Sequence, residues 1–140
     1  MQDFEWNTKY EVGNPRIDFE HRIFLDLIAQ FAEQAHHGVP IKRLQKTCAE
    51  IYKYAAFHFF SEENMLEDAG YRQIDDHRKL HKDLLESLST FSNSLSVDAY
   101  QADELTEFLL RWFTSHTMVE DTKHAPILSV ATPYKEGRTS

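Results

Sequence analysis

A histidine and a glutamate stand on the face of a long predicted helix that should be buried, and this placement constrains the fold more than any other feature. His58 and Glu62 are four residues apart, so on a helix they lie on the same face. Burying an unpaired carboxylate costs several kcal/mol, so the fold must supply a partner for Glu62. The other residues of this face recur in steps of three and four and are apolar: Leu44, Cys48, Ile51, Ala55, and Met65 or Leu66.

The same apolar period predicts an all-α fold. Gly38 and Pro40 end one helical segment, and Asp98 with Gln101 resembles a capping box that starts another. Because the loops are short and each segment has one apolar face, we predict an antiparallel up-down-up-down four-helix bundle. The helices are expected over residues 17–37, 41–68, 73–93 and 98–121.

One domain over residues 1–131 is expected, because a chain of 140 residues can bury a single core. Residues 1–16 form an extended N-terminal arm, whose Trp6 and Tyr10 we expect to pack on the bundle. Residues 132–140 are predicted to be a flexible tail.

Composition excludes several functional classes. The net charge of -8 disfavours phosphate backbones and anionic membranes, so neither nucleic acid nor a membrane is an expected partner. We expect no signal peptide, and no run of apolar residues is long enough to span a membrane, so a cytoplasmic protein is expected. We expect a monomer. Cys48 is the only cysteine and is expected to be a small apolar filler.

Histidines occur on the apolar face of every predicted helix, and this pattern indicates a metal site. So much buried polarity would consume a net stability of only about 5–15 kcal/mol unless a metal compensated it. Imidazole and carboxylate groups in this number suit two metal ions rather than one, with iron favoured and zinc as the alternative. The ferritin-like plan does not fit, because its Glu-x-x-His motif occurs only at Glu33 and His36, at the wrong end of a helix. The residues concerned are His21, His58, Glu62, His77, His81 and His116, with Asp121 five residues later.

These residues resemble the ligand motifs of the hemerythrin family. The matching motifs are Ile17-Asp18-Phe19-Glu20-His21, His58-x3-Glu62, His77-x3-His81 and His116-x4-Asp121. Trp6 and the Val12-Gly13 pair resemble the entry arm of bacterial members, and the likeness extends from about Trp6 to Leu128. It implies that His77, His81 and His116 hold one iron, and that His21 and His58 hold a second iron with an open position. Glu62 and Asp121 would bridge the two irons together with an oxo or hydroxo group.

The spacing of the last motif makes a structural prediction of its own. His116 and Asp121 are five residues apart, which places them about 140° apart on an ideal helix. We therefore expect the helix to widen or end near residues 119–121, so that Asp121 can turn inward. His124 lies beyond the motif and is expected at the surface.

The resemblance implies reversible dioxygen binding, for storage, delivery or scavenging, in a protein that is not an enzyme. An oxygen or redox sensor, or a di-iron enzyme acting on peroxide or nitric oxide, is the alternative. Thr117 stands where the family commonly has an aliphatic residue, which leaves the polarity around the site open. Apolar walls would exclude water from the oxygen pocket. The residues expected to line it are Ile17, Phe24, Leu25, Phe59 and Trp112.

Overall fold

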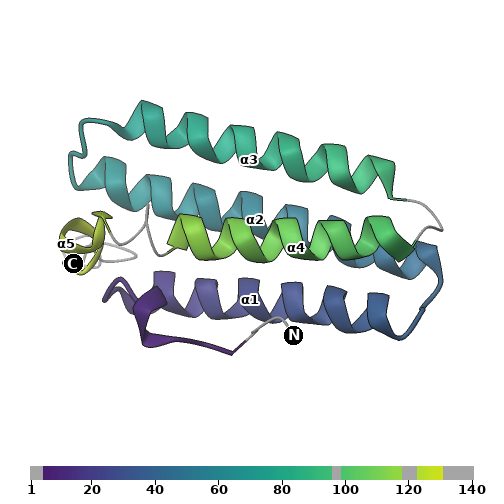
Figure 1. Ribbon diagram of the computed structural model, residues 1–140. Coiled ribbons are helices and arrows are strands. Elements are labelled where there is room, and N and C mark those ends of the chain that lie inside the picture. The colour runs from purple at the N-terminus through teal and green to yellow at the C-terminus, as the bar shows by residue number, and fades with distance from the viewer. Residues whose placement is uncertain (1–4, 96–98, 118–122, 131–140) are drawn as a thin grey trace, which may run out of the picture.

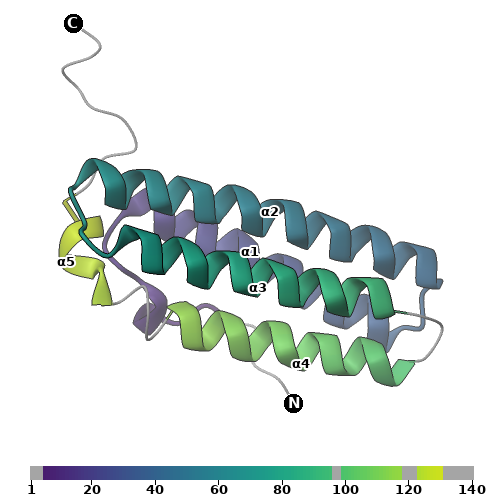
Figure 2. The same cartoon turned by 90° about the horizontal axis from the view of Figure 1, so that it is seen from above.

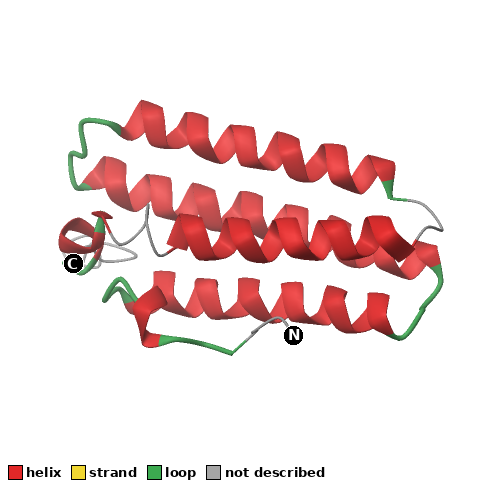
Figure 3. Cartoon of the chain, in the orientation of Figure 1, coloured by secondary structure: helices red, strands yellow, loops and turns green. Residues whose placement is uncertain are grey.

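The computed structural model describes residues 5–95, 99–117 and 123–130. In these residues every regular element is a helix, as Figure 3 shows. The four long helices alternate in direction and lie side by side, so the antiparallel four-helix bundle is confirmed (Figures 1 and 2). The elements are η1 (Thr8–Tyr10), α1 (Pro15–His36), α2 (Ile41–Asp68), α3 (Ile74–Ser94), α4 (Ala99–Ser115) and α5 (Ala125–Leu128).

Some helices begin or end at residues other than those predicted. There, capping side chains that do not belong to the apolar pattern set the position of the helix end. α1 begins two residues before residue 17, because the Asn14 side chain accepts hydrogen bonds from the backbone N–H groups of Arg16 and Ile17. Proline at the first helical position, Pro15, suits such a start. At the other end of α1, Gly38 has a φ of 66°, the left-handed conformation expected of a helix stop.

The regular part of α4 is shorter than predicted. Its α-helical conformation ends at Ser115, and His116 and Thr117 continue in π-helical conformation, which is a wider turn. The helix therefore widens at His116, before the stretch at residues 119–121 where widening was expected. That stretch, like Asp98 of the predicted capping box, lies outside the described residues.

The N-terminal arm and α5 close one end of the bundle. Both oxygens of Asp18 accept hydrogen bonds from the arm, from the N–H of Val12 at 2.8 Å and that of Gly13 at 3.2 Å. The side-chain amide of Asn14 donates to the carbonyl oxygen of Leu128 at 2.8 Å, which ties α5 to the start of α1. Gly13 has a φ of 83°, and a Cβ there would lie only 3.2 Å from Cβ of Ser129, so the crossing of arm and C-terminal turn requires glycine.

The core runs the length of the bundle and has a smaller extension under α5. Tyr10 packs edge-on against Phe113 at 5.3 Å between ring centroids, and Trp6 packs on Tyr10 at the same distance, as the sequence predicted for the arm. The extension consists of Val12, Ile17, Met65, Leu66 and Leu128. Among the described helices, none is both long and apolar enough to cross a membrane.

Candidate metal centre

Polar side chains from all four long helices meet in the half of the bundle that the arm and α5 close. Each of them is at most 5% exposed. They form two overlapping groups, and within each group one nitrogen or oxygen atom per residue lies within 4.8 Å of the others. Glu62 belongs to both groups. The first group is Glu62, His77, His81 and His116, and the second is His21, His58 and Glu62.

In the first group, three imidazoles and one carboxylate oxygen point at a common volume. Nε2 of His77 lies 2.5 Å from Oε1 of Glu62, and Nε2 of His81 lies 3.5 Å from the same oxygen. Nε2 of His81 also lies 3.2 Å from Nε2 of His116. Two imidazole nitrogens that face each other beside a carboxylate oxygen can all serve as ligands of one cation placed between them.

The second group is equally buried but has two histidines instead of three. The rings of His21 and His58 lie edge to face with centroids 4.6 Å apart. Nε2 of His58 lies 3.9 Å from Oε2 of Glu62, which is too long for a hydrogen bond. Oε2 of Glu62 is buried and has no hydrogen-bond partner among the described residues. A buried acceptor without a partner costs about 1–3 kcal/mol or more, and a cation bound between these groups would remove that cost.

The electrostatics of Glu62 also suit a ligand shared by two cations. Burial alone would raise the pKa of this carboxyl group. Hydrogen bonds from His77 and His81, and the charges of His116 and His58, outweigh burial and hold its pKa well below the ordinary value. The group is therefore a carboxylate at neutral pH, with one oxygen directed to each histidine set. The types of donor atom, their burial and the lack of a hydrogen-bond partner for Oε2 of Glu62 among the described residues fit a pair of metal ions.

The structure brings together six of the seven predicted ligands. Asp121 lies outside the described residues, so its place in the centre remains a prediction. The π-helical turn at His116 and Thr117 changes the helical phase just before it, as a spacing of five residues requires.

The prediction that His124 lies at the surface is wrong. His124 is buried, and its ring packs edge to face against His77 at 4.7 Å between centroids. Its Nε2 lies 2.8 Å from the hydroxyl oxygen of Tyr71. The reason is the short helix α5, which folds back over the end of the bundle. His124 directly precedes α5, and it therefore covers His77 of the first ligand group.

Two carboxylates to which the sequence analysis assigned no role lie behind candidate ligand histidines. Glu20 lies against Nδ1 of His58, and Glu63 lies against Nδ1 of His81. Glu20 is four residues after Arg16, and Glu63 directly follows Glu62, so from sequence both resemble ordinary charged residues of an outer face.

The five residues predicted to line an oxygen pocket separate into two sets. Phe24, Phe59 and Trp112 are near neighbours, with Trp112 5.2 Å from Phe24 and 5.3 Å from Phe59 between ring centroids. The other two, Ile17 and Leu25, are buried in the core and line no part of the cavity described next.

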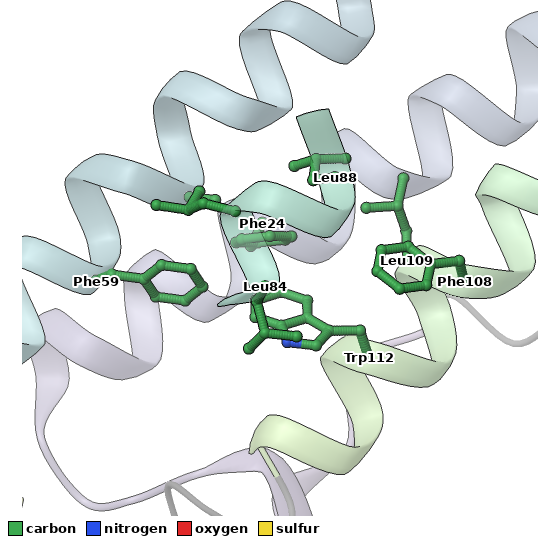
Figure 4. A pocket seen from close by; sticks show the side chains of 9 residues that line it. Phe24, Phe59, Leu84, Leu88, Phe108, Leu109 and Trp112 are labelled. Carbon is green, nitrogen blue, oxygen red and sulfur yellow. The ribbon is translucent and has the colours of Figure 1, made fainter. Parts of the chain in front are cut away.

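Phe24, Phe59 and Trp112 border a small apolar cavity (Figure 4). The cavity has room for about one water-sized molecule. Trp112 also stacks on His116 at 5.2 Å, so the cavity adjoins the ligand groups. Its remaining lining residues are Ala55, Leu84, Leu85, Leu88, Phe108 and Leu109.

Comparison with known proteins identifies the family. The sequence model of the Hemerythrin HHE cation binding domain matches residues 12–128, most of the chain. The chain belongs to the hemerythrin family. A bacteriohemerythrin of Clostridium acetobutylicum is 27% identical over an alignment of 128 residues that covers 86% of this chain and 98% of that protein. A myohemerythrin of Theromyzon tessulatum is 24% identical over 88% of this chain and 92% of its own length.

Solved structures agree on the fold. A crystal structure of wild-type hemerythrin superposes with a TM-score of 0.79 at 22% identity, covering 90% of this chain and 98% of the other. Membership of the hemerythrin family carries a non-haem di-iron centre. The two overlapping ligand groups are placed to hold such a pair of ions.

Proposed function

We propose that this hemerythrin-family chain binds dioxygen reversibly at a di-iron centre and acts in oxygen storage, delivery or scavenging rather than as an enzyme. One observation carries the proposal: two buried ligand groups share Glu62, and one of them has three histidines while the other has two. When bound, the two irons supply the redox-active metal and an open coordination position for O2.

The ligand assignment is the one that the family resemblance implies, and the three-to-two division of the histidines supports it. We assign His77, His81 and His116 to the coordinatively full iron, and His21 with His58 to the iron that has room for O2. Glu62 is assigned as a bridge, because each of its oxygens faces one histidine set. Asp121 is assigned as the second bridge from its place in the His116-x4-Asp121 motif alone. An oxo or hydroxo group would be the third bridge.

The surroundings favour a small neutral ligand. Phe24 and Phe59 are at most 2% exposed, and with Trp112 they form an apolar wall between the ligand groups and the middle of the bundle. Such a wall excludes water and protons, which would otherwise promote irreversible oxidation of the centre. A charged substrate would lose its hydration there without gaining a counter-charge.

We also propose that the protein is a cytoplasmic monomer that binds neither nucleic acid nor membranes. The net charge of -8 supports the absence of anionic partners. Sedimentation of the iron-loaded chain tests its assembly state. If a dimer formed, Phe19 and Phe60, which are 61% and 63% exposed on α1 and α2, would be the first residues to examine for contact.

The visible spectrum of the iron-loaded, anaerobically reduced chain tests oxygen binding. We expect admission of air to produce an absorption band that disappears under vacuum and returns over repeated cycles. The His21→Ala variant is the control, because it removes a histidine from the group assigned to the open iron. Rapid, irreversible conversion of the wild-type protein to its oxidised form would instead favour a sensor or an enzyme.

A further inference from the structure

Each ligand group has a carboxylate on its outer side, placed against the ring nitrogen that faces away from the centre. Nδ1 of His58 lies 2.8 Å from Oε1 of Glu20. Nδ1 of His81 lies 2.7 Å from Oε2 of Glu63. In both histidines the opposite nitrogen, Nε2, faces Glu62. Both imidazoles are thus held between an outer carboxylate and the shared inner one.

Glu20 is fixed at both of its oxygens. The residue is 4% exposed, and while Oε1 accepts from His58, Oε2 accepts from Nε of Arg16 at 3.0 Å and from the Ser61 hydroxyl at 3.3 Å. Three donors from two helices leave this carboxylate little freedom to rotate. The Arg16 side chain is 39% exposed, so a short chain of polar contacts leads from the surface to His58.

Glu63 is held less firmly. Its side chain is 15% exposed, and its second oxygen lies 3.5 Å from Nε of Arg78. Arg78 does not serve Glu63 alone, because its guanidinium also pairs with Glu67 and lies 3.7 Å from Asp75. The outer carboxylate of the two-histidine group is therefore the more buried and the more rigid of the two.

An outer carboxylate changes what its histidine offers to a metal. When Nδ1–H donates to the carboxylate, the lone pair is fixed on Nε2, which here faces the centre. The charge-assisted hydrogen bond orients the ring and raises its basicity, and so it strengthens the bond from Nε2 to a cation. The effect on metal binding is largest for an ion that has few protein ligands.

We propose that Glu20 and Glu63 are positioning residues, one for each metal ion, and that Glu20 determines how firmly the oxygen-binding iron is held and how readily it is oxidised. This inference rests on the ligand assignment of the proposed function. Glu20 acts through one of only two histidines on that iron, whereas Glu63 acts through one of three. Removing the charge of Glu20 should therefore affect one iron selectively.

Anaerobic release of ferrous iron to a coloured chelator tests the inference on the full, iron-loaded chain. We expect the wild-type protein to release its two irons in two phases. Glu20→Gln keeps an acceptor for Nδ1 but removes the charge, and should speed the release of one iron per chain by about 10–100-fold. Glu63→Gln should speed the other phase by a smaller factor.

The matched control is Glu67→Gln, because Glu67 also pairs with Arg78 but its side chain is 58% exposed, away from the buried histidines. It should leave both phases unchanged. In a redox titration, Glu20→Gln should also raise the midpoint potential of one iron, because a less basic His58 stabilises the oxidised metal less. If these ion pairs were purely structural, removing them would lower only the melting temperature of the metal-free protein. Unchanged release phases and potentials, or equal acceleration of both phases, would overturn the inference.

A second variant covers the case in which Glu20→Gln does not fold. Ser61→Ala removes one of the three donors to Glu20 and leaves the carboxylate in place. It should speed the same release phase by a few-fold, and no change in that phase would count against the inference. Because iron release is measured without oxygen, its outcome does not depend on whether the protein binds O2 reversibly.

Discussion

The two halves of the bundle are built on the same four helix faces but filled with different side chains. In the metal half, which contains the starts of α1 and α3 and the ends of α2 and α4, the inward positions include His21, His58, Glu62, His77, His81 and His116. In the apolar half, at the opposite end, they are Phe31, Leu44, Cys48, Ile51, Leu88, Leu95 and Leu105. The helical period crosses the boundary without a break.

The difference shows that the two halves are stabilised by different means. In the apolar half, each large side chain removed from water contributes about 1.5–3 kcal/mol. The metal half contains a buried carboxylate with one oxygen that has no hydrogen-bond partner among the described residues, which costs free energy until a cation binds. Stability of the metal half should therefore depend on metal, and stability of the apolar half on packing.

The largest effect is expected from breaking the metal half. His77→Ala should lose iron and stability together, because metal binding and folding are coupled. If free iron stands 1,000-fold above its dissociation constant, the lost stabilisation is about 4 kcal/mol. Thermal unfolding should show a fall in melting temperature on the order of 10 °C.

His37→Ala is the control for this variant, because His37 is exposed at the far end of α1. It should keep two irons per chain and a melting temperature close to that of the wild type. Retention of both irons by His77→Ala would show that His77 is not a ligand.

A packing defect in the apolar half should separate stability from metal. Leu105 is fully buried, and Leu105→Ala should cost about 2–5 kcal/mol by leaving a cavity. Iron content, measured on the folded protein, should remain at two per chain because no ligand is moved. Loss of iron at the same free-energy cost would mean that the two halves unfold as one unit and that the comparison has no energetic meaning.

Sequence alone was sufficient for the fold and for the convergence of six of the seven candidate ligands. The apolar period and the short loops predicted the bundle, and the family motifs predicted which histidines converge. The period has no information about groups that lie beside the core face. Glu20 and Glu63 are of this kind, because their partners His58 and His81 come from other helices and only the packed bundle brings them together.

The errors at helix ends and in the C-terminal segment have a similar origin. The start of α1 is set by the Asn14 cap, and the end of regular α4 by a change to π-helical geometry at His116. Neither depends on the apolar period. His124 follows the last motif in sequence, and only the return of α5 across the bundle end buries it against His77. Local patterns could not predict this long-range contact.

A hydroxyl introduced at the border of the two halves should act on the oxygen pocket. Phe24 lies 5.2 Å from Trp112 and 5.9 Å from Phe113 between ring centroids, and it is 1% exposed. Phe24→Tyr should cost about 1–3 kcal/mol, since the hydroxyl loses its hydration. It should also speed autoxidation several-fold by making the wall more polar, while iron content stays at two per chain.

Phe31→Tyr makes the same chemical change in the apolar half, where Phe31 is fully buried. It should carry a similar cost in stability with no change in autoxidation rate, measured from the decay of the oxygenated spectrum. Equal acceleration by both variants would point to general loosening of the bundle rather than to a wall beside the metal centre.

The smallest effect concerns Cys48, which reports on the apolar half without altering it. Burial raises the pKa of its thiol, and a hydrogen bond with Ser92 offsets only part of that rise. At pH 8 the folded, iron-loaded protein should therefore react with a thiol reagent at least about 100-fold more slowly than the chain unfolded in guanidinium. Removing iron with a chelator should raise this rate by less than about tenfold, because opening near Cys48 requires separation of apolar side chains rather than loss of metal. A metal-free protein whose Cys48 reacts as fast as that of the unfolded chain would contradict the independence of the two halves.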